Sequence, residues 1–300
     1  MDAFSRKKRF VRVGDASVAY YEDGEGAPLL LLHGCPFSSF IWRKVIPRLS
    51  SEFRCLAPDL LGLGDTEAQT GADWSIPAQA QMVLGFLDEL GIERAHVVGH
   101  DQGGAIAQLL AARHPARVDR LVLSNAQAYD NWPSRRERPL VRLTQLPLLG
   151  RLAAWLASKR PVAWLALALG RGVRKPGVLD SELLSGYIRA NLGDPHRRGK
   201  WRRYLSFQLD PVNIRQTAEL GEGLRRFDHP TLLLWGEDDP HYGPQWAKRL
   251  QHDIPGTMRL VTLPRTGHLL MEERPREVAD AIRGFLLADR VSDRLPDVAA

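Results

Sequence analysis

The chain has 300 residues, of which 44% are hydrophobic and 25% are charged, as is ordinary for a soluble globular protein. Its 41 basic and 35 acidic residues give a net charge of +6. This excess is mild, and no expected helix carries the continuous basic stripe that is typical of nucleic-acid binding, so we expect no nucleic-acid partner. Two cysteines, Cys35 and Cys55, are too few for a disulfide framework.

The N-terminal residues are basic, but no apolar segment follows them, so no signal peptide is predicted. The one segment with a membrane-like composition is 148–169, and Arg151, Lys159, Arg160 and Pro161 interrupt it. Such a segment cannot span a bilayer. We therefore expect a cytoplasmic protein with no membrane partner, either a monomer or a homodimer.

The first elements are strands. Residues 9–22 alternate with period two and predict a strand pair. From Leu29 to about Ser124, apolar strand patterns alternate with helical patterns, which indicates a parallel sheet covered by helices on both faces. One of these helices follows Ser75, a suitable N-cap residue, and has Pro77 in its first turn.

The alternation then stops. Between residues 130 and 222 the patterns are helical, with helices expected at 148–159, 162–169 and 180–191, and a strand pattern returns only at 231–235. We expect a core domain of residues 1–129 and 223–300, interrupted by a helical cap domain of residues 130–222. The last predicted helix begins at Pro275 and ends near Leu287.

The most informative motif is G-H-D-Q-G-G at residues 99–104. It follows the short apolar strand predicted at 95–98 and precedes a helical pattern. Glycines at this spacing permit a tight strand-to-helix turn that lifts one side chain, here Asp101, clear of the sheet. The ordinary alternative is that Asp101 is a helix N-cap.

Five motifs, in this order, resemble those of the α/β-hydrolase family. They are H-G-C-P at 33–36, D-L-L-G-L-G-D at 59–65, the turn at 99–104, W-G-E-D-D-P at 235–240 and T-G-H at 266–268. The resemblance implies an α/β fold with a mostly parallel central sheet and a helical cap inserted after the sixth strand. It also implies a catalytic trio of Asp101, Asp239 and His268. Asp238 competes with Asp239, whose spacing from Trp235 fits the family better.

An aspartate in the nucleophile position allows a particular reaction. A carboxylate has an ordinary pKa of about 3.9, is already charged at neutral pH, and can displace a leaving group from a saturated carbon to form an ester. We expect His268 to activate the water that hydrolyses this ester, and Asp239 to orient the imidazole. The backbone N–H groups of Cys35 and Gln102 are the expected oxyanion donors. No metal-ligand spacing occurs among the histidines, so no metal or other cofactor is expected, and the partners are a small-molecule substrate and water.

An aspartate in the nucleophile position of this turn is a feature that resembles two families of α/β hydrolases, the haloalkane dehalogenases and the epoxide hydrolases. The loops at 33–43 and 59–65 resemble the dehalogenase version, but Gln102 stands where those enzymes usually have tryptophan, and Cys35 where many have asparagine. The amide N–H of Gln102 can still hold a halide. A second donor can come from a cap tryptophan, and the candidates are Trp132, Trp155, Trp164 and Trp201.

Epoxide hydrolases instead protonate the leaving oxygen with two cap tyrosines, for which Tyr187 and Tyr204 are candidates, with Tyr129 at the edge of the cap. The sequence also leaves open a haloacid clamped by arginine, an ester or lactone substrate, and a non-catalytic binding or luciferase-like protein. We expect a hydrolase that forms an aspartyl ester with a small, mainly apolar electrophile, with a carbon–halogen bond ranked ahead of an epoxide.

Overall fold

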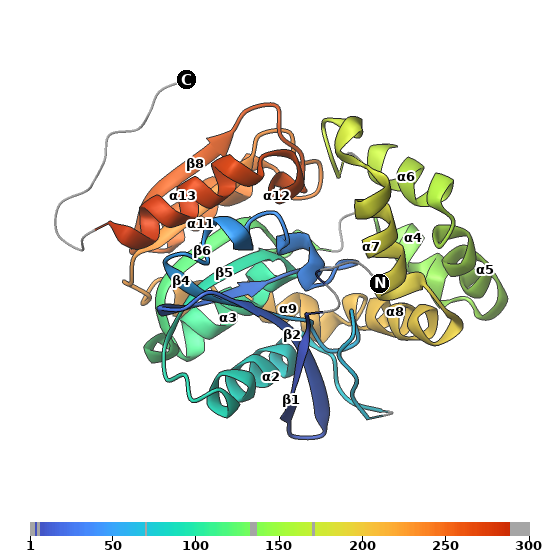
Figure 1. The fold of residues 1–300 in the computed structure, drawn as a ribbon, viewed down its shortest axis with the longest axis horizontal. Coiled ribbons are helices and arrows are strands. Elements are labelled where there is room, and N and C mark those ends of the chain that lie inside the picture. Colours follow the sequence, from blue (N-terminus) through green and yellow to red (C-terminus); the bar gives the residue numbers. More distant parts are fainter. Residues whose placement is uncertain (1–3, 5–6, 70, 133–136, 170–171, 289–300) are drawn as a thin grey trace.

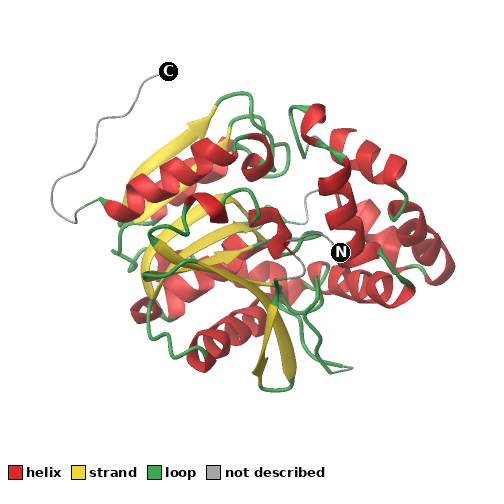
Figure 2. Cartoon of the chain, in the orientation of Figure 1, coloured by secondary structure: helices red, strands yellow, loops and turns green. Residues whose placement is uncertain are grey.

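A computed structural model describes residues 4, 7–69, 71–132, 137–169 and 172–288. Its centre is an eight-stranded sheet with the strand order β1-β2-β4-β3-β5-β6-β7-β8 (Figures 1 and 2). The strands are β1 Arg9–Val13, β2 Ala16–Asp23, β3 Ala27–Leu32, β4 Phe53–Pro58, β5 Ala95–Asp101, β6 Val118–Ala126, β7 Thr231–Gly236 and β8 Thr257–Leu263.

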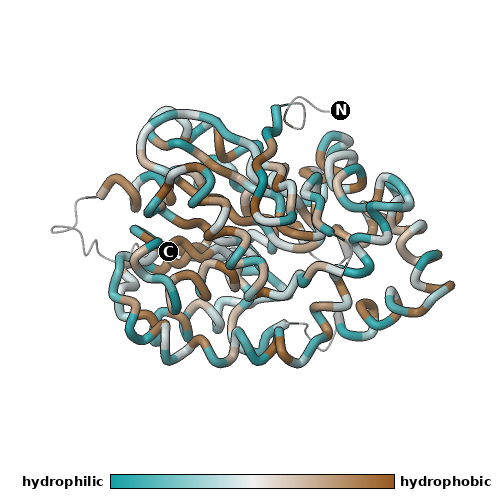
Figure 3. Tube along the Cα trace, turned by 90° about the horizontal axis from the view of Figure 1, so that it is seen from below, coloured by the Kyte–Doolittle hydropathy of each residue, from teal (hydrophilic) through white to brown (hydrophobic). Residues whose placement is uncertain are grey.

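The sheet is mostly parallel, as predicted. β1 pairs with β2, and β2 with β4, in antiparallel fashion, whereas all pairs from β4 to β8 are parallel. Every residue of β5 and β7 is buried, because a parallel sheet is covered on both faces and its strands need not alternate with polar residues. In Figure 3 hydrophobic residues accordingly follow the strands through the middle of the molecule.

Helices cover both faces of this sheet. Helices α2, α3 and α11 bury apolar side chains in the core on one face, and α13 does so on the other with the short helices η1, η2 and α12. Ser75 caps α2 as predicted, since its hydroxyl accepts the N–H of Ala78 at 3.3 Å. These helices are η1 Ser39–Trp42, η2 Ile46–Arg48, α2 Ile76–Glu89, α3 Gln102–Arg113, η3 Pro115–Arg117, α11 Pro244–Asp253, α12 Leu270–Glu273 and α13 Pro275–Leu287.

A helical insertion separates β6 from β7 and lies to one side of the sheet (Figure 1). Three of its helices were predicted from the sequence, although Pro161 lies in the first turn of α6 rather than between two helices, because a helix tolerates proline there. The prediction did not name α4, α8, α9 and α10. The elements are α4 Glu137–Gln145, α5 Pro147–Ala157, α6 Arg160–Leu169, η4 Pro176–Val178, α7 Ser181–Leu192, α8 Pro195–Gln208, α9 Pro211–Glu219 and α10 Gly221–Leu224.

Asn191 of α7 connects this insertion to the core through hydrogen bonds. Its side-chain oxygen accepts the N–H of Gly64 at 2.9 Å, and its amide donates to the carbonyl of Pro36 at 2.6 Å. Because Pro36 follows β3 and Gly64 follows β4, α7 is bonded to the loops at the carboxyl ends of two central strands. The predicted fold class, with its inserted helical cap, is confirmed.

Over the described residues, no helix is both long enough and apolar enough to cross a membrane. Cys35 and Cys55 are both free thiols.

Candidate active site

Asp101 occupies the sharp turn between β5 and α3. Its φ of 55° and ψ of −121° are strained for a residue with a side chain, and such strain is concentrated at functional sites. The turn closes because Gly103 has no side chain, since a Cβ there would lie 2.6 Å from the carbonyl oxygen of His33. The Asp101 side chain makes no capping hydrogen bond to α3, so the ordinary N-cap role does not explain it.

The Asp101 carboxylate is held by backbone donors on one side and by a histidine on the other. Its Oδ1 accepts the N–H of Cys35 at 3.0 Å, the N–H of Gln102 also bonds to the carboxylate, and Oδ2 lies 3.5 Å from Nε2 of His268. Burial by itself raises the pKa of Asp101, but the hydrogen bond and charge of His268 outweigh burial and lower that pKa. The group is therefore ionised at neutral pH.

His268 links this carboxylate to a second one. Its Nδ1 lies 2.9 Å from Oδ2 of Asp239, whose other oxygen accepts the backbone N–H groups of His241 at 2.8 Å and Tyr242 at 3.1 Å. Asp238 instead points to the surface and pairs with Arg174. Burial lowers the pKa of His268, but Asp239 and Asp101 more than reverse this and raise it to about 10.

Asn125 is a positioning residue that sequence reasoning did not find. Its amide donates to the carbonyls of Gly267 and His268 at 3.1 and 2.9 Å, and its oxygen accepts the N–H of Gly236 at 2.8 Å. It thereby joins the histidine loop to the end of β7, from which Asp239 is presented. Asn125 has a φ of 38°, which asparagine tolerates better than most residues. An asparagine near the end of an apolar strand was the only hint in the sequence.

A second histidine lies beside His268 but stays neutral. The ring of His100 is 4.7 Å from that of His268 between centroids, and its Nδ1 lies 3.0 Å from the carbonyl oxygen of Ser124. Burial lowers the pKa of His100 to about 3. His100 therefore adds no positive charge next to His268.

Helix α8 places a polar network over the nucleophile. The hydroxyl of Tyr204 donates to Oε1 of Gln102, and Nε2 of Gln102 donates to Oε1 of Gln208 at 2.6 Å. The indole N–H of Trp132 donates to the same oxygen of Gln208 at 3.1 Å. Both ends of the Gln102 amide are thus hydrogen-bonded to α8. Gln208 was missed in the sequence, although it follows Tyr204 by four residues and so shares its helix face.

Trp201 lies on the same helix beside the Cys35 thiol. Its indole N–H has no hydrogen-bond partner within the described part of the chain. Burial raises the pKa of the Cys35 thiol well above its ordinary value, and the charge of Asp101 adds to this. The Trp201 indole acts against these two effects, but the thiol stays neutral.

Three of the predicted cap contacts, Trp155, Trp164 and Tyr187, have surroundings other than the Asp101 carboxylate. Trp155 and Trp164 are 46% and 40% exposed, because α5 and α6 form the outer part of the insertion. Tyr187 packs its ring 4.6 Å from that of Phe37, with Glu272 and Arg43 beside its hydroxyl. Tyr129, the edge candidate, donates its hydroxyl to Asp253 at 2.7 Å. The structure thus brings Trp132, Trp201 and Tyr204 to the site, and not the pair of Tyr187 and Tyr204.

The described residues contain no group of three or more His, Cys, Asp or Glu side chains suited to a metal ion. The arrangement instead offers a charged carboxylate, backbone N–H groups on one of its oxygens, and an imidazole held by a second carboxylate. Such a set can attack an electrophile and then hydrolyse the resulting ester.

Comparisons with known proteins agree with this geometry. Residues 27–275 match the sequence pattern of the α/β hydrolase fold. Haloalkane dehalogenase 2 of Mycobacterium tuberculosis is 30% identical over 88% of this chain and 90% of its own length. Epoxide hydrolase 3 of Xenopus tropicalis is 27% identical over 93% of this chain and 78% of its own length. The solved structure of an ancestral haloalkane dehalogenase matches with a TM-score of 0.78 at 27% identity, over 93% of this chain and 98% of that one.

Proposed function

The chain belongs to the α/β-hydrolase family, and we propose that it hydrolyses a carbon–halogen bond in a small, mainly apolar substrate through an ester of Asp101. One observation carries this proposal: the strained turn holds an ionised carboxylate between two backbone N–H groups and His268.

In the first step Oδ2 of Asp101 attacks the carbon that bears the halogen. An oxygen–carbon bond forms, the carbon–halogen bond breaks, and the halide leaves with the bonding electron pair. Oδ1 stays on the backbone N–H of Cys35 and becomes the carbonyl oxygen of the ester. No proton moves in this step.

Once Asp101 is esterified, the imidazolium of His268 releases its Nε2 proton to solvent. In the second step water attacks the ester carbonyl carbon while the neutral His268 takes its proton. Negative charge then develops on Oδ1, which already accepts the N–H of Cys35, and the N–H of Gln102 acts on the same carboxyl group. Preorganised donors of this kind usually supply the largest share of such catalysis. The tetrahedral intermediate expels the alcohol, which takes the proton from His268. The remaining proton of the water passes from the new carboxyl group to His268, which restores the ionised Asp101 with one oxygen from water.

The donors around Asp101 support a halide as the leaving group. A halide needs N–H donors rather than an acid. The indole N–H of Trp201, which has no partner in the described residues, and the second N–H of the Gln102 amide, whose first N–H is held by Gln208, can supply them. The similarity to haloalkane dehalogenase 2 extends over most of both chains and supports this choice.

Epoxide opening is the second candidate, and Tyr204 is the observation that favours it. Its hydroxyl lies over Gln102, and burial raises its pKa well above the ordinary value, with Cys35 and Asp101 adding to this. Tyr204 can therefore donate a hydrogen bond to a leaving oxygen. Since Tyr187 lies elsewhere, an epoxide would meet one cap tyrosine rather than two.

The test uses His268→Gln, which keeps the nucleophile but lacks the base for the second step. The variant is incubated with a 1-bromoalkane or with the 1,2-epoxyalkane of the same chain length, and the intact protein and its peptides are weighed. We expect the bromide to add an alkyl group at Asp101. An epoxide would add its whole mass as a hydroxyalkyl ester, and that result alone would favour the second candidate.

Two further substitutions, each made in the His268→Gln variant, test the donors of Trp201 and Tyr204 separately. Trp201→Phe should slow formation of the alkyl adduct by roughly tenfold to a hundredfold, because one donor to the halide is lost. Tyr204→Phe is the matched loss of an O–H donor and should affect the bromide less than an epoxide. If the native protein releases bromide while His268→Gln never carries an adduct at Asp101, the covalent mechanism is wrong.

A further inference from the structure

One segment of the insertion carries charge of a single sign. Residues 138–179 contain no Asp or Glu, whereas an even spread of the chain's 35 acidic residues would put about five there. The same segment has eight basic residues, Arg138, Arg142, Arg151, Lys159, Arg160, Arg171, Arg174 and Lys175. Its residues up to Leu169, with Glu137 before them, form helices α4, α5 and α6. This surface therefore attracts anions.

Exposed apolar side chains gather on the same helices. Of the fourteen large hydrophobic residues that are exposed in the described part of the chain, eleven lie between Leu140 and Leu165. We call eight of them the outer cap face: Leu148, Leu149, Leu152, Trp155 and Leu156 of α5, and Val162, Trp164 and Leu165 of α6. The α5 members recur at the spacing of one helix face. A gathering of this kind on a soluble domain marks an interaction site.

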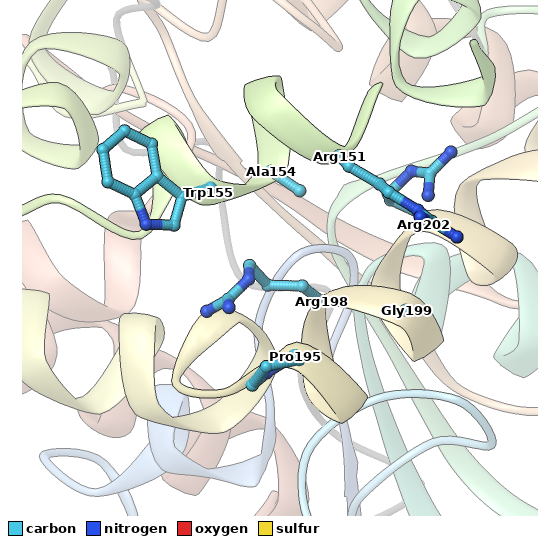
Figure 4. A pocket seen from close by; sticks show the side chains of 7 residues that line it. All are labelled: Arg151, Ala154, Trp155, Pro195, Arg198, Gly199 and Arg202. Atoms are coloured by element: carbon cyan, nitrogen blue, oxygen red, sulfur yellow. The ribbon is translucent and has the colours of Figure 1, made fainter. Parts of the chain in front are cut away.

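A basic pocket lies beside the outer cap face, between α5 and α8 (Figure 4). It has a volume of about 460 Å³ and is lined by Arg151, Arg198, Arg202 and Trp155, with Ala154, Pro195 and Gly199. Arg198 and Arg202 donate to the backbone carbonyls of Leu192 and Thr144 at 3.0 and 2.7 Å. No described carboxylate pairs with these three arginines, so their remaining N–H groups are available to an anion such as phosphate.

We propose that the outer cap face docks on a membrane of anionic phospholipid, with a lipid phosphate in the Arg151–Arg198–Arg202 pocket. Leucine and tryptophan side chains enter the interfacial region while the arginines and Lys159 meet the headgroups, which is the usual arrangement of an interfacial helix. Lys159 already lies 4.3 Å above the Trp155 ring. Docking of this kind needs no spanning helix, and it replaces the sequence-based expectation of no membrane partner.

The charge pattern favours an anionic membrane over two other possible partners of the outer cap face. A second copy of the chain related by a twofold axis would bring the same face against itself, and so place arginine opposite arginine. A nucleic acid would suit the arginines but would leave the leucines in contact with phosphate and water. An anionic bilayer surface offers phosphate groups to the arginines and an apolar interior to the leucines.

Helix α8 connects the docking surface to the site. Arg198 and Arg202 line the pocket, while Tyr204 and Gln208, on another face of the same helix, contact Gln102. The docking proposal does not depend on the reaction proposed above, and its test involves no turnover.

The test is co-sedimentation of the full-length protein with vesicles of phosphatidylcholine alone, or of phosphatidylcholine mixed with phosphatidylglycerol. We expect binding only to the mixed vesicles, weakened by salt. Arg151→Gln combined with Arg198→Gln should weaken binding roughly fivefold for each arginine removed. Leu148→Ser combined with Leu149→Ser should weaken it roughly tenfold for each leucine.

Phe10→Ser and Arg12→Gln are matched controls on the distant strand β1, where both residues are exposed, and should bind like the native protein. Brominated lipids should quench native fluorescence, and Trp155→Phe combined with Trp164→Phe should remove most of that quenching. The proposal is overturned if mixed vesicles do not bind, or if the leucine variant binds as well as the native protein. It is also overturned if the native protein forms a lipid-free dimer that the leucine variant abolishes.

Discussion

At the residue scale, Asp101 and His268 control each other's charge. In the free protein Asp239 and Asp101 both lie against His268, and together they raise its pKa to about 10. An imidazole with that pKa is protonated at neutral pH and cannot act as a base. Esterification of Asp101 removes its negative charge, so the pKa of His268 falls when a base is needed. The proposed intermediate thus activates its own hydrolysis.

Asp101→Asn removes that charge permanently and tests this coupling. We expect the pKa of His268 to be lower in the variant than in the native protein when its ring signals are titrated by NMR. Asp238→Asn is the matched control, because Asp238 pairs with Arg174 at the surface, and it should leave the pKa of His268 at its native value. An unchanged pKa in Asp101→Asn would show that the two groups are not coupled.

The raised pKa of His268 also affects the stability of the folded protein. A folded pKa of about 10 exceeds the ordinary value of 6.5 for histidine, so the folded state binds the proton more tightly than the unfolded state. This contribution is fully present below pH 6.5 and is lost as the pH rises towards 10. Chemical denaturation across this range should show a shallower loss of stability in Asp101→Asn than in the native protein.

At the scale of elements, the turn between β5 and α3 depends on close approach of backbones. A Cβ on Gly103 would collide with the carbonyl oxygens of Leu32 and His33 at the end of β3. A Cβ on Gly99 would meet the backbone of Gly103. The motif therefore fixes where α3 starts against the sheet, and with it the position of Asp101.

Gly103→Ala should consequently destabilise the fold by about 2–3 kcal/mol, since backbone atoms must move to make room. Gly284→Ala in α13 is the matched control, because a Cβ there meets no atom within 4 Å. It should stabilise the protein by about 0.5–1 kcal/mol, as alanine favours a helix over glycine. Urea denaturation measures both, and an equal effect of the two variants would contradict this view of the turn.

At the scale of the whole molecule, the features that could be predicted from the sequence are those that depend on residues close together in the chain. The apolar runs of β5 and β7 and the glycines around Asp101 are dictated by short-range geometry, so the sheet and the position of the turn could be predicted. Trp155 and Trp201 show what the local sequence pattern cannot predict. Both are tryptophans on helices of the insertion, and only long-range packing decides that α5 faces outward while α8 covers the nucleophile.

Asn125 and Gln208 escaped prediction for a related reason. Each acts through partners more than a hundred residues away in the chain, Gly236 and Gln102 respectively. No spacing rule connects such pairs, and both amides resemble ordinary polar residues in the sequence. The site is assembled by the fold, although Asp101 can be recognised before the fold is known.

In the proposed reaction, water attacks Asp101 of the protein rather than the substrate. Excess protein and a haloalkane substrate are allowed one turnover in water enriched in oxygen-18, and both the peptide containing Asp101 and the alcohol product are then weighed. We expect one heavy oxygen in the carboxylate of Asp101 and ordinary oxygen in the alcohol. Heavy oxygen in the alcohol, with none in Asp101, would contradict it.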